Sequence, residues 1–392
     1  MAKKSKQQNK SKYVVVIRGP SGVHFLPDQR LPVNNFPRKT GNVDLIFRTR
    51  YVKFKEHKVA IPMGFWVDVR GPAPSLKLAI EVFTNAARCI AAIISVSSNA
   101  PVGDLEAELA FNITPGLKKR EYFQQHLLEE RIRPGQGRKV NLEAILGLLR
   151  AIGEHPEGDR LHRAATHYHH ALQDWKPGHE INALAHLYIG MEALTPIARE
   201  RHLEQTKMNK EQLIAKWNIE KDKLDPEIRR RILFQGDDES YRNAKAASDS
   251  YEHSYEPLPK VRTLAAAVRE KTAHYLRSAI IDLAEVEASA ATILRSPPFD
   301  KPLFWAFAKY MMGFLIGEGD RLAADKQEYP ILRWKSKVKE VNQDKEGNIN
   351  INFEEEFSPR LAEGISFKPE RFEVWGPSNS KTSAPKTLSK NK

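Results

Sequence analysis

Histidine is the side chain that titrates closest to neutral pH, and this chain gathers its histidines in one segment. Eight of the thirteen histidines lie within residues 155–202. If this segment is helical, His167 and His170 share one face at a spacing of three residues. His169 aligns instead with His162, which lies one heptad earlier. The spacing therefore predicts two pairs of histidines on different faces of one helix.

Metal binding is the first chemistry that such a cluster suggests. A zinc site needs three or four converging ligands from cysteine, histidine or carboxylate side chains. Glu180, His186 and Glu192 on the next helical run could complete a site, but their spacing does not require it. The segment has no cysteine and no His-Glu-x-x-His motif. We therefore expect hydrogen-bonded histidines on helix faces, and we assign no metal ligand and no cofactor.

A second candidate is the histidine in the stretch ASDSYEHSY, residues 247–255. His253 lies there among hydroxyl groups and two acids, Asp249 and Glu252, which would raise its basicity. Serine and aspartate are also common cap and turn residues, so the stretch is compatible with a polar connection between two helices. Two interpretations stay open: a catalytic or binding histidine, and a structural one.

The sequence lacks the motifs of several large enzyme classes. It contains no G-x-x-x-x-G-K, no G-x-G-x-x-G and no G-x-S-x-G. The single cysteine, Cys89, lies in the apolar helical run NAARCIAAII, where a small buried thiol is expected. One cysteine allows no disulfide within the chain and fits a reducing compartment such as the cytoplasm. P-loop enzymes, dinucleotide enzymes, G-x-S-x-G esterases and enzymes with a cysteine nucleophile are therefore disfavoured.

The net charge of +13 comes mainly from the two ends of the chain. Residues 1–12 carry five lysines and residues 378–392 carry four, with no acid in either segment. Both segments lack an apolar set to bury, so we predict disordered basic tails. Five tail lysines are named as candidates for salt-sensitive contacts with nucleic acid: Lys3, Lys4, Lys6, Lys386 and Lys390. Solubilising ends are the alternative, because the body between the tails is only mildly basic.

Hydrophobic patterning predicts an α+β fold with a mixed strand and helix domain over residues 13–155. Alternation of apolar residues indicates strands at four segments: 13–19, 42–54, 63–74 and 105–113. In the last of these, Leu109 and Phe111 are expected to point into the core. Helical spacing indicates helices at 75–96, capped by Ser75, and at 141–153.

From residue 156 the pattern becomes helical, and we predict a bundle over residues 156–295. Its helical runs are 157–175, 179–197 and 259–289, with a charged insertion at 198–240. The first two are joined by Lys-Pro-Gly and should form an antiparallel hairpin. Within the insertion, Asp225 is expected to cap a helix that begins at Pro226.

A smaller β-rich part is predicted for residues 300–377. It contains a hairpin at 334–357 and an apolar segment at 302–317, which we expect to be buried. The apolar segment is too short to span a membrane and contains a lysine, so no membrane association is expected.

The helical part resembles HEPN domains. Three features carry the resemblance: a helix hairpin with LYIGMEAL (187–194), a polar connection with a histidine, and a long last helix with VREKTAHYLRSAIIDL (268–283). The arrangement is most similar to the Apea-like branch, in which a β-containing domain precedes the bundle. The resemblance covers residues 159–197 and 240–290, about a quarter of the chain.

The resemblance implies an activity and a site. Active HEPN proteins are metal-independent RNases that dimerise through the bundle, and they use an Arg-x(4–6)-His pair on the 2′-hydroxyl proton and the scissile phosphate. Aligning this pattern places Ser248 where arginine belongs, Asp249 at an asparagine and His253 at the histidine. Arg242 lies 11 residues before His253, about 16 Å along a continuous helix, so it could serve only through a dimer mate.

Three functions follow, in order of preference. The first is a divergent HEPN-like protein, not an enzyme, that binds RNA, a nucleotide or a protein partner, which by resemblance implies bacterial defence or a toxin–antitoxin system. The second is a metal-independent endoribonuclease that acts as a homodimer through His253, with Asp249 and Arg242. The third is a structural or interaction protein with no role at nucleic acid.

Overall fold

The computed structural model describes most of the chain. The described residues are 11–53, 60–125, 137–176, 178–253, 256–303, 308–318, 321–325, 329–343, 345 and 349–375. The five candidate tail lysines lie outside these residues. Within them the chain has the predicted α+β fold, with α-helices and antiparallel sheets.

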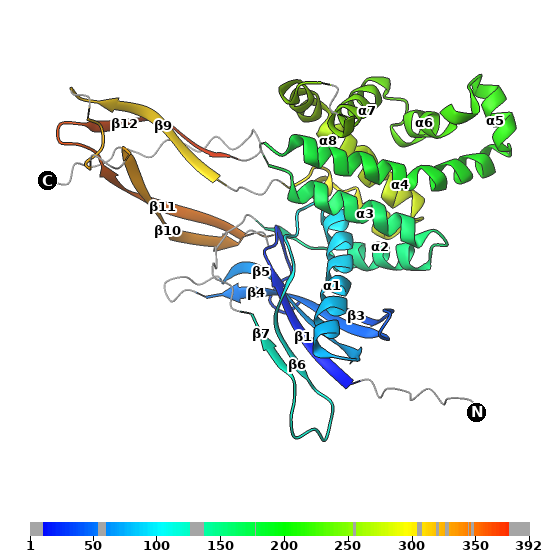
Figure 1. Ribbon diagram of the computed structural model, residues 1–392, viewed down its shortest axis with the longest axis horizontal. Coiled ribbons are helices and arrows are strands. Elements are labelled where there is room, and N and C mark those ends of the chain that lie inside the picture. The colour runs from blue at the N-terminus through cyan, green and yellow to red at the C-terminus, as the bar shows by residue number, and fades with distance from the viewer. Residues whose placement is uncertain are drawn as a thin grey trace. The chain divides into compact units, whose positions relative to one another are not determined.

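A six-stranded sheet forms the base of the fold (Figure 1). Its order is β3-β4-β5-β1-β6-β7, and the strands are β1 (Ser11–Gly19), β3 (Leu31–Phe36), β4 (Val43–Val52), β5 (Ile61–Ala73), β6 (Glu106–Asn112) and β7 (Tyr122–Gln124). β1 pairs antiparallel with both β5 and β6. Two short strands, β2 (Val23–His24) and β8 (Arg138–Lys139), pair in parallel beside it.

Helix α1 (Leu76–Ser98) covers one face of this sheet. Ser75 caps it as predicted, because its Oγ accepts from the main-chain N–H of Leu78 at 3.3 Å. The predicted apolar stripe is also confirmed in its centre, where Phe83, Ala87 and Ile90 are buried in the core shared with the strands. Burying a side chain the size of Phe83 contributes about 1.5–3 kcal/mol.

The pattern of β6 differs from the prediction because the strand contains a bulge. The register of β6 against β1 skips Glu108. An extra residue reverses the side-chain alternation beyond it. Ala107 and Ala110 are therefore buried, while Leu109 and Phe111 are only half-buried. The prediction that these two residues point into the core was wrong.

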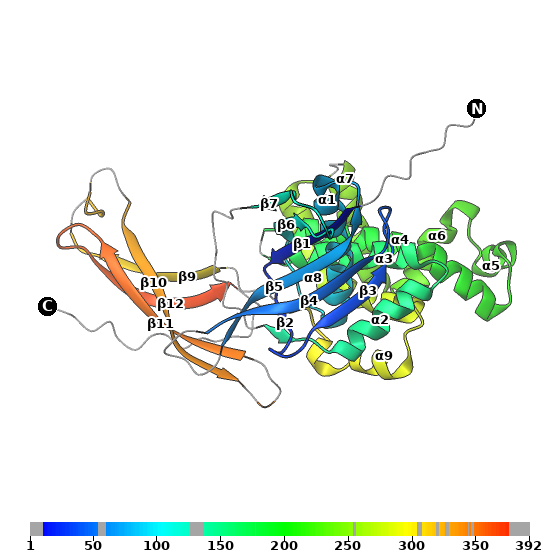
Figure 2. The ribbon, with the colours of Figure 1, turned by 90° about the horizontal axis from the view of Figure 1, so that it is seen from below.

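The helices pack on the far side of α1. They are α2 (Leu142–Glu154), α3 (Gly158–Gln173), α4 (Glu180–Thr206), α7 (Asp238–His253), α8 (Leu258–Leu283) and α9 (Ala288–Leu294). α3 and α4 form the predicted hairpin, and α4 packs on both α7 and α8. Because α3 also packs against α1, α1 lies between the sheet and the helices (Figures 1 and 2).

This shared packing changes the predicted domain division. The first of two compact units comprises Met1–Tyr51, Pro62–Arg133 and Gly137–Leu303. It therefore unites the two parts that we predicted as separate domains at 13–155 and 156–295. The physical reason is that α1 is apolar on more than one side. Phe83 packs in the core shared with the sheet, and Ile93 and Val96, which are not part of that core, are buried as well.

The charged insertion is helical. It continues α4 to Thr206 and then forms α5 (Lys210–Trp217) and α6 (Leu224–Ile228), followed by a π-turn at Arg229–Leu233. Asp225 is not the cap that we predicted. It lies inside the first turn of α6, where its carboxylate accepts from Arg199 of α4 at 2.6 Å. The Asp225 carboxylate therefore bonds an arginine 26 positions away and not the backbone N–H groups at the start of the helix.

The second unit comprises Val52–Ile61, Pro134–Gln136 and Phe304–Lys392. Its strands are β9 (Ala308–Ile316), β10 (Ile331–Gln343), β11 (Ile349–Arg360) and β12 (Ser366–Trp375). β10 and β11 form the predicted hairpin, and β9 pairs with β12. The expectation that residues 302–317 are buried was wrong for β9, because Met312 and Phe314 are 52% and 57% exposed.

α1 is also the helix that bears on membrane association. Among the described residues it is the one helix long and apolar enough to cross a bilayer. Two thirds of its apolar window is buried inside the protein, between sheet and helices. α1 is therefore placed as a core helix of this unit.

Candidate functional site

The stretch around His253 belongs to a helix. α7 runs unbroken from Asp238 to His253, so residues 247–253 are its last turns and not the polar connection that we considered. Arg242 and His253 therefore lie on one continuous helix, three turns apart. The backbone of His253 is described, but its side chain lies outside the described part of the structure.

The other residues predicted for this site have separate partners. Ser248 is buried, with 2% of its surface exposed. The carboxylate of Asp249 forms an ion pair with Lys245, one turn earlier on the same helix. The Nε of Arg242 donates to the main-chain oxygen of Asp238 at 3.2 Å. Among the described contacts, none joins these three predicted residues to one another.

This geometry does not assemble an Arg–His pair within one chain. A buried Ser248 offers no positive charge to a phosphate, and its neighbour Asp249 would repel one. Lys245 partly offsets that repulsion, but both partners of this pair are only half-buried, and ion pairs open to solvent contribute little. Ser248 and Asp249, which align with the Arg-Asn part of the RNase pattern, therefore supply no cation.

The histidines of α3 divide between two faces, as their spacing predicts. His162 and His169 face α1, where they contact Cys89 and Ser95. His167 and His170 lie against His186 of α4. The two pairs predicted from the sequence are thus confirmed, and each pair meets a different helix.

His169 is held neutral in the core. Its Nε2 accepts from the side-chain amide of Gln173 at 3.2 Å. The proton must therefore lie on Nδ1, which donates to Ser95 Oγ at 2.8 Å. Burial, helped by the neighbouring His170, lowers the pKa of His169 to about 3. Both ring nitrogens are satisfied, so His169 is a structural residue.

The second pair forms a half-buried histidine cluster, defined as His167, His170 and His186. The Nδ1 atoms of His167 and His186 lie 3.3 Å apart, and the rings of His170 and His186 lie 5.2 Å apart. Burial and the neighbouring imidazoles lower the pKa of His167 to about 4 and also lower the pKa of His186. Within the described residues no three His, Cys or acidic side chains are arranged to hold a metal ion.

His162 takes part in a contact that the sequence did not reveal. Its Nε2–H donates to the main-chain oxygen of Cys89 at 3.2 Å, since a carbonyl can only accept. Burial raises the pKa of the Cys89 thiol, but the hydrogen bond and charge of His162, together with Arg38, outweigh burial and leave the pKa lowered. Burial likewise lowers the pKa of His162, and Cys89 reverses this to a net rise.

The two shifts mean that Cys89 and His162 each favour the charged form of the other at the α1–α3 contact. We predicted a small buried thiol at Cys89, whereas it is half-buried and lies beside His162 and Arg38. Cys89 and His162 are 73 positions apart in the sequence. The only local signal was the alignment of His162 with the core-facing His169.

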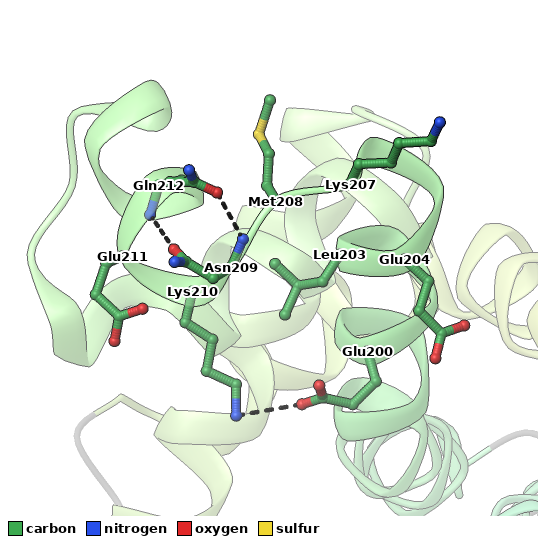
Figure 3. A pocket seen from close by; sticks show the side chains of 9 residues that line it. All are labelled: Glu200, Leu203, Glu204, Lys207, Met208, Asn209, Lys210, Glu211 and Gln212. Atoms are coloured by element: carbon green, nitrogen blue, oxygen red, sulfur yellow. Dashed lines mark hydrogen bonds and ion pairs between the residues drawn. The ribbon is translucent and has the colours of Figure 1, made fainter.

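A shallow hollow lies between the end of α4 and the start of α5 (Figure 3). Asn209 and Gln212 form a capping box there, each side chain bonding the other residue's backbone N–H. Lys210 pairs with Glu200 at 3.3 Å. These side chains are occupied with each other and with the helix end, so the hollow is a feature of the turn and not a catalytic site.

Comparison with known proteins identifies no relative: no family model, no curated protein and no solved structure matches this chain. The resemblance of the helical part to HEPN domains therefore stays a prediction.

Proposed function

We propose that this protein is a divergent HEPN-like protein that binds RNA without cleaving it. The observation that carries the proposal is the position of Ser248, which is buried where the related RNases would place an arginine. Asp249 beside it is an acid paired with Lys245, and Arg242 is bonded to its own helix. These contacts favour loss of catalysis over an intact Arg–His pair.

The charge distribution supports RNA as the partner. The predicted tails carry nine of the thirteen net positive charges, but Lys12, one of the nine, lies in β1 and not in a disordered tail. Lysines near a phosphate backbone displace counterions and so give affinity that falls with salt. By the same resemblance, the setting would be bacterial defence or a toxin–antitoxin system in the cytoplasm, with a homodimer formed through the bundle.

Binding and cleavage are tested with one RNA. The full-length protein is mixed with a labelled single-stranded RNA in EDTA, and binding and chain length are followed together. We expect a retarded but uncut RNA, both for the wild type and for His253→Ala. Absence of binding at low salt would refute the proposal.

The same experiment decides the enzymatic alternative. Cleavage in EDTA that His253→Ala abolishes would establish a metal-independent endoribonuclease in place of a binding protein. Arg242→Ala then tests whether Arg242, which lies three turns before His253 on α7, supplies the missing positive charge. A homodimer would have to bring it to the histidine of the other copy, because the two lie about 16 Å apart on one helix.

A second candidate is an interaction protein, favoured by β9. Met312, Phe314 and Ile316 alternate along this strand and are each about half exposed. Apolar residues at every second position share one face of a strand. Replacing these three with serine should leave RNA binding unchanged if RNA is the partner, whereas loss of a protein partner or of self-association would favour the interaction role.

A further inference from the structure

The face of the six-stranded sheet that α1 does not cover carries a mixed set of aromatic and basic side chains. Residues that pack toward α1 include Val15, Val67 and Leu45. Their neighbours along each strand must point the other way. Figure 2, seen from below, shows β1, β4 and β5 in front of the helices of this unit.

One row of this open face crosses four strands. The register pairs Tyr122 of β7 with Phe111 of β6, Phe111 with Val14 of β1, and Val14 with Arg70 of β5. Directly paired residues share a face, so these four side chains stand in line. With strands about 4.8 Å apart, the row is roughly 14 Å long.

The two ends of the row are open to solvent. Tyr122 is 63% exposed and Arg70 is exposed, while Phe111 is half-buried and Val14 is only 6% exposed. Arg70 has no ion pair among the described residues. The acid in the next row, Asp68, is already bound by Arg48 at 3.1 Å. An exposed aromatic ring and an available guanidinium group thus lie at opposite ends of one platform.

Positive charge gathers near the Tyr122 end of the row. The turn between β6 and β7 carries Lys118, Lys119 and Arg120, all exposed. β1 enters the sheet beside this turn, since the main-chain N–H of Lys12 donates to Thr114 Oγ1 at 2.8 Å. The lysine-rich N-terminal segment precedes β1 and so joins the fold next to the turn.

We propose that this sheet face binds single-stranded RNA, with bases stacked on Tyr122 and Phe111 and the backbone held by Arg70 and the Lys118–Arg120 turn. The inference rests on the proposed RNA binding and names its surface. Unpaired bases stack on exposed aromatic side chains of sheets regardless of sequence, and nearby cations follow the backbone. Duplex RNA hides its base faces and would not use the row.

The test uses the full-length protein and a fluorescein-labelled 20-nucleotide oligouridine, with anisotropy measured over a range of KCl. Tyr122→Ala and Arg70→Ala remove exposed side chains and should leave the fold intact. Tyr329→Ala and Arg150→Ala are the matched controls, because both residues are exposed and lie outside the row. A third variant replaces the tail lysines Lys3, Lys4, Lys6, Lys386 and Lys390 with glutamine.

We expect Tyr122→Ala to weaken binding about tenfold, as loss of one stacked base would. Arg70→Ala should lower the slope of log affinity against log salt by about 0.7. Both controls should bind as the wild type does, and a duplex of the same length should bind less tightly.

The outcomes separate this inference from the proposed function. If the wild type binds oligouridine but neither row variant changes its affinity, the open face is not the binding surface, although RNA binding stands. Binding that disappears only in the tail variant leads to the same conclusion and assigns RNA to the tails. Equal affinity for the duplex also overturns stacking on the row. If the wild type does not bind RNA at all, the proposed function itself fails.

Discussion

The guanidinium group of Arg277 closes the C-terminal end of helix α1 from inside the protein, because its Nε donates to the main-chain oxygen of Val96 at 2.7 Å. Its Nη2 also donates to the main-chain oxygen of Leu294 at 2.8 Å. The last carbonyls of a helix have no partner within it and carry partial negative charge. The Nη1 of Arg138 donates to the main-chain oxygen of Ser98, the last residue of α1, at 2.7 Å. Two arginines thus satisfy main-chain oxygens at the end of α1, which allows the helix to end inside the protein.

Removing Arg277 should therefore destabilise the fold. Burial lowers the pKa of its guanidinium, yet the carbonyls hold it in the core. Arg277→Ala leaves several buried carbonyls without donors, and we expect unfolding free energy to fall by about 3 kcal/mol or more. Urea unfolding followed by circular dichroism measures this. Arg150→Ala, at an exposed position of α2, should change it by less than about 0.5 kcal/mol.

Acid should destabilise the protein through its neutral histidines. The pKa is lowered to about 3 in His169 and to about 4 in His167, so the folded state resists protonating them. The unfolded state takes up these protons below about pH 6.5. The contribution of these two rings to stability should be constant above that pH and should fall between about 6.5 and 4, by about 1.4 kcal/mol per pH unit for each ring.

The variant His169→Gln tests this assignment. Over that range it should reduce the slope of unfolding free energy against pH by about 1.4 kcal/mol per pH unit, which corresponds to one bound proton. His274→Gln, at an exposed position of α8, should keep the wild-type slope. Identical slopes for wild type and His169→Gln would show that His169 is not held neutral by the fold.

Cys89 should react as a thiolate at lower pH than an ordinary cysteine. The rate of alkylation by iodoacetamide, measured against pH, should have its midpoint below the usual value of about 8.5. His162→Gln removes the imidazole that lowers the pKa of this thiol, so the midpoint should rise. Cys89→Ser supplies the unreactive control. A midpoint that is the same in wild type and His162→Gln would contradict the pairing.

An arginine at position 248, where the resemblance to HEPN RNases would place one, should not create an active site. Ser248 is 2% exposed, and an arginine side chain at this position would overpack the contact of α7 with its neighbours. We expect Ser248→Arg to lower unfolding free energy by about 1–3 kcal/mol. Asp249→Ala, one position on but only half-buried, should cost about 0.5 kcal/mol or less. A stable Ser248→Arg variant that cleaves RNA would refute this account.

Elements with a clear local period could be predicted from the sequence. The Ser75 cap and the centre of α1 were predicted because capping and helical spacing depend on neighbours within four residues. The two histidine faces of α3 follow from the same geometry. The β10–β11 hairpin was predicted from alternation on either side of its turn.

Predictions failed where a distant residue overrode the local pattern. Asp225 was expected to cap a helix, but Arg199 of another helix binds it. Leu109 and Phe111 were expected in the core, but the bulge at Glu108 reverses the alternation. That reversal places Phe111 on the open face, in line with Tyr122.

The sequence by itself determined the capped helix α1, the β10–β11 hairpin and which histidines share a face, since all three depend on residues close together in the chain. Only the tertiary structure decided that His162 meets Cys89, that Arg277 closes α1, and that Tyr122 and Arg70 end one row. Each of these contacts joins residues tens of positions apart. Their closeness depends on how whole elements pack and pair, which no local spacing records.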